Sequence, residues 1–416
     1  MTKASEYIDS VVSWMAVTAN EQAEIVKVLK SDPQLTQTVR ALDKSGGLNK
    51  LFLQTRETIT PTLLQIFGGR LQSYDAKVVR SHIVKTGYAG GPSGGIRYTL
   101  KHSGLPYEDY FDVICQLHQA RQLLRFDSKI ATSCPSKVVN SKLIVRAGKR
   151  DRMFTGSGAS GIPAHKLPSI PLKDQWDLYH NKAEAMEKYK GPSHSLRFIM
   201  PNRSLLKAQV NQLLCLKINT IFPDSYQGTP TRRAVIAAAA KEYKLTPEVI
   251  TALLMSEQLD QSQNEDAADF QGATHSIAQK NSSIGLGQVV ISTARRNKLF
   301  SVILKDATEK KLSHNAIAYL LASDEFNIFA VAKYIRIVAD AGAKINLSQV
   351  PQTKTEYPGL DMAAYANHAS TWPEDNIAAL ASEYTSTAWD DSLVTMWGTL
   401  TRATHRAVKR SGVVFK

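Results

Sequence analysis

The segment VITALLMSEQLDQ, residues 249–261, places one acid inside an otherwise apolar helix pattern. Ile250, Leu253 and Leu254 recur at the spacing of a buried helix face, and Glu257 continues the same stripe. Apolar neighbours desolvate a carboxyl group, which disfavours its charged form and raises its pKa. A protonated glutamic acid can donate a proton to a leaving-group oxygen, as glycoside cleavage requires. The alternative is that Glu257 pairs with a lysine or an arginine.

A glycine-containing turn follows in SIGLGQVV, residues 283–290. Two glycines allow main chain to approach a bulky ligand closely, and peptide and amide groups can bind sugar hydroxyl and acetamido groups. We therefore predict a substrate-binding role for the main chain at Gly285 and Gly287, which flank Leu286, and for the Gln288 amide. The alternative is an ordinary glycine turn between two short strands.

The acidic loop between these two motifs is a candidate calcium site. Calcium prefers hard oxygen ligands, and such ligands are available from Asp260, Gln261, Glu265, Asp269 and Ser283. The loop is not an EF-hand, because the sixth residue from Asp260 is Glu265 where a glycine is required. A solvated acidic loop is the alternative, and Asp260 could instead orient an attacking water.

Helix start signals indicate how these residues are positioned. Thr246-Pro247 supplies an N-cap hydroxyl and a proline at the first helical position, so we expect a helix from 247 that carries Glu257. Ser313 is predicted to cap the helix after it, and Asp324 the next one. The core face of that last helix is expected to contain Ile328, Val331, Ile335 and Val338.

The remaining patterns predict a mainly α-helical protein. Residues 1–80 show helical periodicity, and the glycine-rich stretch 87–98 is predicted to be a turn rather than a phosphate loop. A Gly/Ser/Pro-rich stretch at 151–173 indicates a domain boundary. We therefore predict an N-terminal helical region, 1–170, and a second domain, 171–416, with a small β-element at SIGLGQVV.

The composition restricts the class of protein. A net charge of +14 favours an acidic partner, such as nucleic acid, an anionic membrane surface or a carboxylate-bearing polymer. The first fifteen residues lack the pattern of a secretory signal, so the chain is expected to start out cytoplasmic. The three cysteines, Cys115, Cys134 and Cys215, are widely spaced, and we predict that they are small core residues rather than a disulfide framework.

The order of these motifs resembles a known family. Glu257, GLGQ at 285–288, DEFNIFAVAKYI at 324–335 and AYAN at 364–367 are similar to the lysozyme-like superfamily, and the separation between Glu257 and Gln288 resembles goose-type lysozymes. The stretches SEQLDQSQNEDAADFQ, NSSIGLGQVVISTA and ALASEYTSTAWDD resemble exported muramidase toxins of the type VI secretion system. This resemblance extends from about Ala41 to Asp391.

The resemblance implies a goose-type lysozyme-like catalytic domain and an antibacterial role. It implies injection without a signal peptide into a neighbouring bacterium's periplasm, where peptidoglycan glycan strands are cut between N-acetylmuramic acid and N-acetylglucosamine. The implied cofactor is Ca²⁺. The implied partners are a cognate immunity protein and components of the secretion tube, with peripheral membrane contact as a further expectation and no nucleic acid.

By position, the resemblance also implies roles for single residues. Glu257 matches the catalytic acid, with Asp260 as a second candidate, and Gly285, Leu286 and Gln288 match the glycan-contacting turn. Tyr365 and Asn367 match an aromatic-asparagine element of the cleft, although His368 replaces the glycine that usually follows. Two rival functions remain: cleavage to an anhydro sugar by the same acid, and nucleic-acid or membrane binding by the basic stretch TRATHRAVKRSG, residues 401–412.

Overall fold

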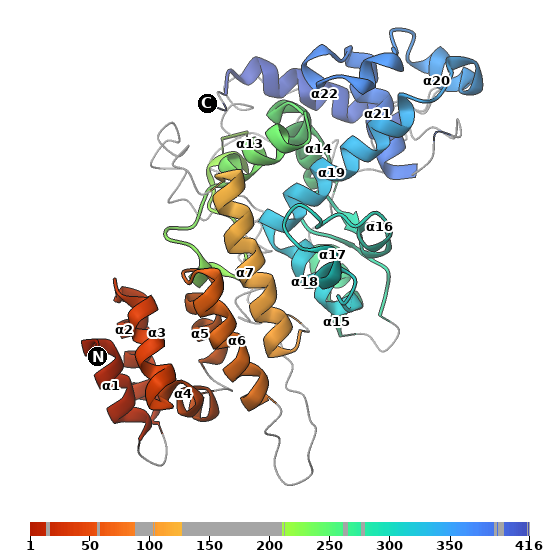
Figure 1. Ribbon diagram of the computed structural model, residues 1–416. Coiled ribbons are helices and arrows are strands. Elements are labelled where there is room, and N and C mark those ends of the chain that lie inside the picture. The colour runs from red at the N-terminus through yellow and green to blue at the C-terminus, as the bar shows by residue number, and fades with distance from the viewer. Residues whose placement is uncertain are drawn as a thin grey trace. The chain divides into compact units, whose positions relative to one another are not determined.

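The chain forms two compact units, shown as a ribbon in Figure 1. The first unit contains residues 1–123, 221–229 and 301–319, and the second contains 124–220, 230–300 and 320–416. The computed structural model describes residues 1–13, 17–55, 59–87, 105–126, 210–211, 213–260, 265–275, 279–386 and 395–413, with residues 103, 389 and 415. The predicted boundary at residue 170 and residues 88–98 of the predicted turn over 87–98 lie outside these residues and stay predictions.

The first unit is helical in its described part, as its sequence predicts. Its second helix begins at a capping box, in which the Thr18 hydroxyl accepts from the Glu21 amide and the Glu21 carboxylate accepts from the Thr18 amide. Ile25 and Leu29 of this helix are fully buried. The elements are α1 (Lys3–Val12), α2 (Ala19–Ser31), α3 (Leu35–Ser45), α4 (Gly47–Thr55), α5 (Thr60–Gly68), α6 (Ser73–Gly87), α7 (Tyr107–Leu124), η3 (Pro223–Ser225) and α17 (Asp306–Glu309).

The second unit is also mainly helical, which confirms the predicted fold class. Its elements are α13 (Arg232–Glu242), α14 (Pro247–Asp260), α15 (Glu265–Thr274), β1 (Ser283–Ile284), β2 (Val289–Val290), α16 (Ile291–Arg296), α19 (Asp324–Gly342), η4 (Leu347–Gln349), α20 (Pro351–Glu356), η5 (Ala363–Ala366), η6 (Ala369–Thr371), α21 (Glu374–Ser386) and α22 (Thr395–Ser411). Helix α18 (His314–Ala322) contains residues of both units.

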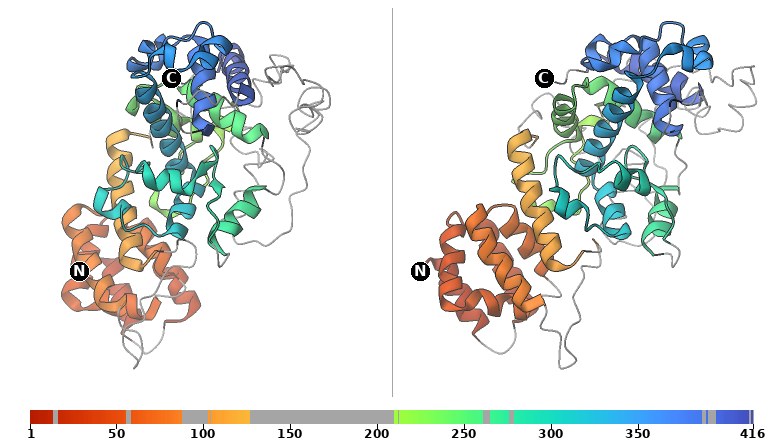
Figure 2. Two further views of the ribbon diagram at one scale, coloured as in Figure 1. Left: turned by 90° about the vertical axis from the view of Figure 1, so that its right-hand side faces the viewer. Right: turned by 45° about the vertical axis from the view of Figure 1, so that its right-hand side comes forward.

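Helix α19 is the central element of the second unit. It packs against α13, α14, β2 and α21, and Figure 2 shows the ribbon from two further sides. The predicted core face of this helix is confirmed, since its four residues are at most 6% exposed: Ile328, Val331, Ile335 and Val338. A helix that is buried on several sides can fix the positions of the elements around it.

The predicted β-element is an antiparallel hairpin with two residues in each strand. Ser283 pairs with Val290 and Ile284 with Val289, so the turn between them is formed by residues 285–288. Gly285 has φ +87° and Gln288 has φ +47°, and both therefore lie in the left-handed region. A glycine at the first of these positions avoids the strain that a side chain would cause there.

A buried ion pair anchors the start of α19. The Asp324 carboxylate accepts from Arg232 Nε at 2.6 Å and from the Asn219 amide at 2.7 Å, and both charged side chains are at most 1% exposed. The predicted N-cap role of Asp324 is wrong, because the cap residue is Ser323 and Asp324 is the first helical residue. The Asp324 carboxylate is hydrogen-bonded to Arg232 and Asn219, so it does not cap its own helix. The predicted cap at Ser313 is confirmed by its hydroxyl, which accepts from the Ala316 amide.

One prediction about the cysteines is wrong. Cys215 is fully buried but forms a disulfide bond, whereas its sequence position predicts a core residue without a disulfide. Widely spaced cysteines give no local sign of a single cross-link, because the fold decides which of them meet. Cys115 keeps a free thiol, and burial raises its pKa to about 12, so this thiol is not activated as a nucleophile.

The Arg232–Asp324 pair provides a test of the packing. Asp324→Ala should lower the free energy of unfolding by about 3–5 kcal/mol, because it leaves the Arg232 charge buried without its partner. Asp340→Ala is the matched control, since Asp340 pairs with Arg336 while 58% exposed, and it should cost less than about 1 kcal/mol. Urea unfolding of the full chain measures both values. An equal effect of the two substitutions would contradict the anchoring role.

Candidate functional site

Glu257 lies on the buried face of α14, as its sequence position predicts. Its side chain is 8% exposed, and the apolar residues of the same stripe, Ile250, Leu253 and Leu254, are at most 2% exposed. The helix begins at the predicted cap, where the Thr246 hydroxyl accepts from the Val249 amide at 3.4 Å. Glu257 is therefore a largely desolvated carboxyl group on a well-defined helix.

Helix α22 holds α14 next to this acid. The Thr401 hydroxyl donates to Ser256 Oγ at 3.2 Å, and Ser256 Oγ donates to Thr404 Oγ1 at 3.4 Å. All three hydroxyl groups belong to residues that are at most 3% exposed. Buried hydroxyl groups need partners, so this cluster fixes the rotation of α14 one residue before Glu257.

The residue after Glu257 joins α14 to the hairpin turn. The Gln258 side-chain amide donates to the Leu286 carbonyl at 2.9 Å. On the other side of the turn, the Gly287 amide donates to Asn327 Oδ1 at 2.8 Å, and the Gly287 carbonyl accepts from the Tyr384 hydroxyl at 3.0 Å. The turn is thus bound by residues of α14, α19 and α21.

The glycines of the turn make room for protein atoms. A Cβ added at Gly285 would collide with the Asn327 side chain and with the Leu321 carbonyl, and one added at Gly287 would collide with Val331. Asn327 fills the space at Gly285 and donates to the Ile284 and Leu321 carbonyls at 2.9 and 2.8 Å. The close approach that was expected for a ligand is therefore made by α19.

The three residues predicted to contact the glycan have different environments. Leu286 is fully buried, and the Gly285 carbonyl accepts from both the main-chain and the side-chain amide of Gln288, at 3.1 and 2.8 Å. Gln288 itself is only half-buried. Its side chain is therefore the part of the turn that can reach solvent, and the substrate contacts of all three residues stay predictions.

Tyr384 of α21 is a site residue that the sequence analysis missed. Burial and the neighbouring Glu257 carboxylate raise its pKa well above the usual value, so the phenol is protonated and lies near the acid. Its ring packs edge-on against Tyr334, with the centroids 5.1 Å apart. Its proton is donated to the Gly287 carbonyl, so the phenol ties α21 to the hairpin turn.

Asn327 and Gln258 were also missed, and a signal for Asn327 exists in the sequence. It is a polar residue on the apolar helix FNIFAVAKYI, as Glu257 is on its own helix, and it is fully buried. A buried polar side chain requires hydrogen-bond partners, and the backbone of the turn supplies them. The same test that singled out Glu257 could have singled out Asn327.

Among the described residues, no hydrogen bond, ion pair or ring contact joins Tyr365 or Asn367 to Glu257. Tyr365 is fully buried, its hydroxyl donates to the Asn376 carbonyl at 2.6 Å, and its ring packs on Trp372 and Trp389. Asn367 is exposed. Tyr365 thus has no surface that a ligand could contact, because packing and its hydroxyl bond occupy it.

The predicted calcium ligands are only partly described. Asp260 is the last residue of α14 and Glu265 the first of α15, but the side chains of both lie outside the described part, as does Gln261. Asp269 is half-buried on α15, which packs against the strand that contains Ser283. The described residues contain no cluster of three metal-binding side chains. The calcium site therefore stays a prediction, based on the preference of calcium for the oxygen donors that these residue types carry.

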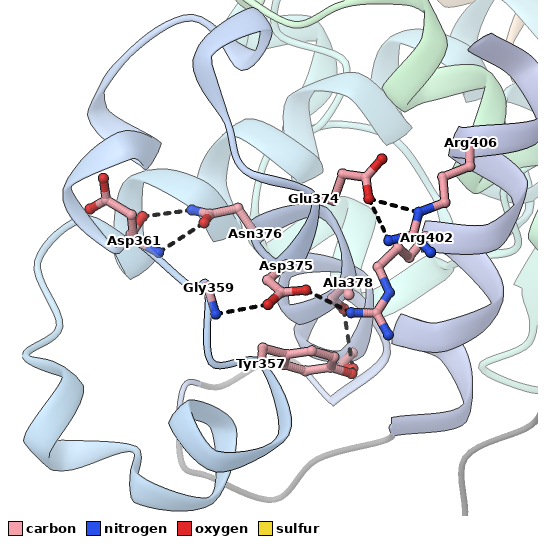
Figure 3. A network of polar contacts seen from close by, with 10 residues as sticks. Tyr357, Gly359, Asp361, Glu374, Asp375, Asn376, Ala378, Arg402 and Arg406 are labelled. Atoms are coloured by element: carbon pink, nitrogen blue, oxygen red, sulfur yellow. Dashed lines mark hydrogen bonds and ion pairs between the residues drawn. The ribbon is translucent and has the colours of Figure 1, made fainter. Parts of the chain in front are cut away.

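The basic stretch 401–412 belongs to α22, and two of its arginines are paired. Arg402 binds Asp375 at 2.6 Å and Arg406 binds Glu374 at 2.5 Å, as Figure 3 shows. Asp375 also accepts from the Gly359 amide at 2.8 Å. These contacts tie α22 to α21, so the arginines stabilise the fold instead of forming an open cationic surface.

Comparison with known proteins places the chain in a family. Two family models match it: T6SS, Peptidoglycan muramidase Tse3, N-terminal domain, at residues 2–118, and T6SS, Peptidoglycan muramidase Tse3, catalytic domain, at residues 154–340. The chain is 38% identical to the peptidoglycan muramidase Tse3 of Pseudomonas aeruginosa over 411 residues, which cover 95% of each chain. The chain therefore belongs to the Tse3 family of type VI secretion system peptidoglycan muramidases.

Proposed function

We propose that Glu257 is the general acid with which this peptidoglycan muramidase cleaves the β-1,4 bond between N-acetylmuramic acid and N-acetylglucosamine. The observation that carries this proposal is a carboxyl group only 8% exposed on a helix fixed at the neighbouring residues 256 and 258. Burial favours the protonated form, which is the form that donates to the glycosidic oxygen.

The proposed reaction assigns separate tasks to the acid and its neighbours. Glu257 protonates the leaving oxygen as the glycosidic bond breaks, and water attacks the anomeric carbon. Tyr384 is proposed as a positioning residue, because its phenol binds the hairpin turn and lies near Glu257, where its buried ring helps to keep water from the acid. Asp260, three residues after Glu257, is proposed to orient the water or to bind the cation.

We further propose that the chain is delivered by the type VI secretion system and acts in the periplasm of the target bacterium. Family membership supports this role, and a cognate immunity protein and secretion-tube components are the partners it suggests. Peripheral membrane contact remains a proposal. None of the helices in the described part of the chain has the length and apolarity needed to span a bilayer.

Calcium is proposed as a structural cofactor of the 260–283 region. Asp260, Glu265 and Asp269 would hold the ion, together with Gln261 and Ser283, and the bound ion would order the chain that follows the helix of Glu257. Packing of α15 against β1 supports the proposal, because it brings the segments of Asp269 and Ser283 together. The ion would not take part in bond cleavage.

A first test replaces the acid. Glu257→Gln keeps the side-chain shape but removes the proton donor, so the rate of peptidoglycan digestion should fall about a hundred- to ten-thousand-fold. Mass spectrometry of the released muropeptides measures the rate and identifies the product. Full activity of the variant would remove Glu257 from the mechanism, and products lighter by one water would show attack by a sugar hydroxyl instead of by water.

A second test concerns Tyr384. Tyr384→Phe removes the hydrogen bond to Gly287, so the turn beside Glu257 should be held less firmly and kcat should fall about five- to tenfold. Water should then reach Glu257 more easily and lower its pKa, which would move the alkaline limb of the kcat/KM profile to lower pH. Tyr357→Phe is the matched control, because this tyrosine bonds to Ser382 of the same helix at 2.9 Å. An unmoved pH profile would leave Tyr384 with a packing role only.

A third test removes the metal. Excess chelator should lower activity, and Glu265→Ala or Asp269→Ala should have the same effect on the untreated protein, because each removes a carboxylate ligand. Asp361→Ala is a control acid away from this region. Calcium binding by isothermal titration provides a readout independent of activity. Full activity in chelator, without calcium binding, would rule out the cofactor and leave the role of Glu257 unchanged.

A further inference from the structure

The second unit contains a small pocket of about 190 Å³ that no part of the proposed reaction uses. Its lining comes from the end of α16, the second half of α19, and α21 with the chain that follows it. A cavity of this size can take a small end group of a larger ligand. The lining residues on which the argument rests are Arg296, Tyr334, Ile337, Val338 and Trp389.

Two hydrogen-bond donors line this pocket without an acceptor from the described part of the chain. Arg296 is exposed and takes part in no ion pair there. Tyr334 is 5% exposed, and no described residue hydrogen-bonds to its hydroxyl. A guanidinium group can only donate, and a largely buried hydroxyl without a partner is costly. The two side chains therefore suit a ligand group that accepts hydrogen bonds.

The charges around the Tyr334 hydroxyl favour a negatively charged acceptor. Burial raises the pKa of Tyr334, so the phenol stays protonated and can donate. The positive charge of Arg296 lowers this pKa more than the negative charge of Glu383 raises it. Glu383 also lines the pocket, but it is 1% exposed and already has an interaction within the protein. Of these two charges, the cation therefore has the larger effect on a group bound at the phenol.

The other walls of the pocket are apolar and fixed. The Trp389 indole donates from Nε1 to the Val338 carbonyl at 3.0 Å, which orients its ring. The Tyr334 ring packs edge-on against Tyr384, with the centroids 5.1 Å apart. Ile337 and Val338 add aliphatic surface, which gains free energy when an apolar group covers it.

We propose that this pocket binds a carboxylate carried on a short aliphatic group. Arg296 would bind the carboxylate through charge-assisted hydrogen bonds, and the Tyr334 hydroxyl would donate to one of its oxygens. Ile337 and Val338 would contact the aliphatic carbon atoms. A carboxylate has acceptor oxygens only and therefore matches both donors, whereas Arg296 would repel an ammonium group.

The source of the carboxylate follows from the proposed function, on which this step rests. Peptidoglycan presents a carboxylate beside a methyl group in two places. One is the D-alanine end of a peptide stem, and the other is the lactyl group of a muramic acid from which the stem has been removed. The pocket would therefore let the enzyme distinguish strands by the state of their peptide stems.

The first test measures binding to the full chain without requiring activity. Isothermal titration compares N-acetyl-D-alanine with N-acetyl-D-alaninamide, which is similar in shape but has no charge. The carboxylate should bind at least about tenfold more tightly, because hydrogen bonds to a charged group are stronger than neutral ones. Equal binding of the two compounds, or no binding of the carboxylate, would overturn the proposal.

Two variants locate the site. Arg296→Gln should weaken binding of N-acetyl-D-alanine at least about tenfold and Tyr334→Phe about threefold, because they remove a charged and a neutral hydrogen bond. Arg295→Gln is the matched control, an exposed arginine next in sequence that does not line the pocket, and it should bind as the parent does. An unchanged affinity of the Arg296 variant would contradict the assignment.

A kinetic comparison distinguishes the two sources of the carboxylate. Strands with intact stems are compared with strands stripped by an amidase, which exposes the lactyl carboxylate. Arg296→Gln should lower kcat/KM at least about fivefold on one kind of strand relative to the other, whereas Arg295→Gln should not. A larger loss on intact strands identifies the stem end, and a larger loss on stripped strands identifies the lactyl group. Equal losses on both, or none, would remove the pocket from substrate recognition.

The titration also separates this proposal from that of the general acid. If Glu257→Gln kept full activity while N-acetyl-D-alanine still bound, the role of Glu257 would fail and the pocket would stand. If Glu257→Gln lost activity and the parent bound no carboxylate, the pocket would fail and the general acid would stand.

Discussion

Both main-chain polar groups of Gly287, its amide and its carbonyl, are hydrogen-bonded, and the position of the candidate acid depends on this restraint. Its amide donates to Asn327 of α19 and its carbonyl accepts from Tyr384 of α21. The preceding carbonyl, that of Leu286, accepts from Gln258 of α14. Three helices therefore converge on one short turn, and Glu257 is adjacent in α14 to the residue that binds it. Such preorganisation is what general acid catalysis requires of its donor.

Helix α19 supports the turn near its start and α21 through its middle. Near its start, Asp324 is anchored by Arg232, and Asn327 fills the space beside Gly285. Two turns later, Tyr334 packs on Tyr384, the residue that binds the Gly287 carbonyl. One helix therefore contacts both the turn and the tyrosine that holds the turn from α21.

Local patterns predicted what depends on local chemistry. The caps at Thr246 and Ser313, the hairpin and the burial of Glu257 all follow from spacing within one segment. The partners that fix the acid could not be predicted, since Tyr384 is 97 residues from Gly287 and Thr401 is 145 from Ser256. The cap assigned to Asp324 failed for the same reason: its partner, Arg232, is 92 residues away. Periodicity shows which residue is buried, but only the fold shows what it meets.

The distribution of charge bears on what the enzyme recognises. A net charge of +14 suggests an acidic partner, but the charge of an arginine is available only where no carboxylate already neutralises it. Arg402 and Arg406 are paired on the surface of α22, as Figure 3 shows, and Arg232 is paired in the core. Arg296 differs from these three, because it is exposed and takes part in no ion pair among the described residues. Net charge therefore overstates what an acidic partner can bind, since only the cations that no carboxylate neutralises are available to it.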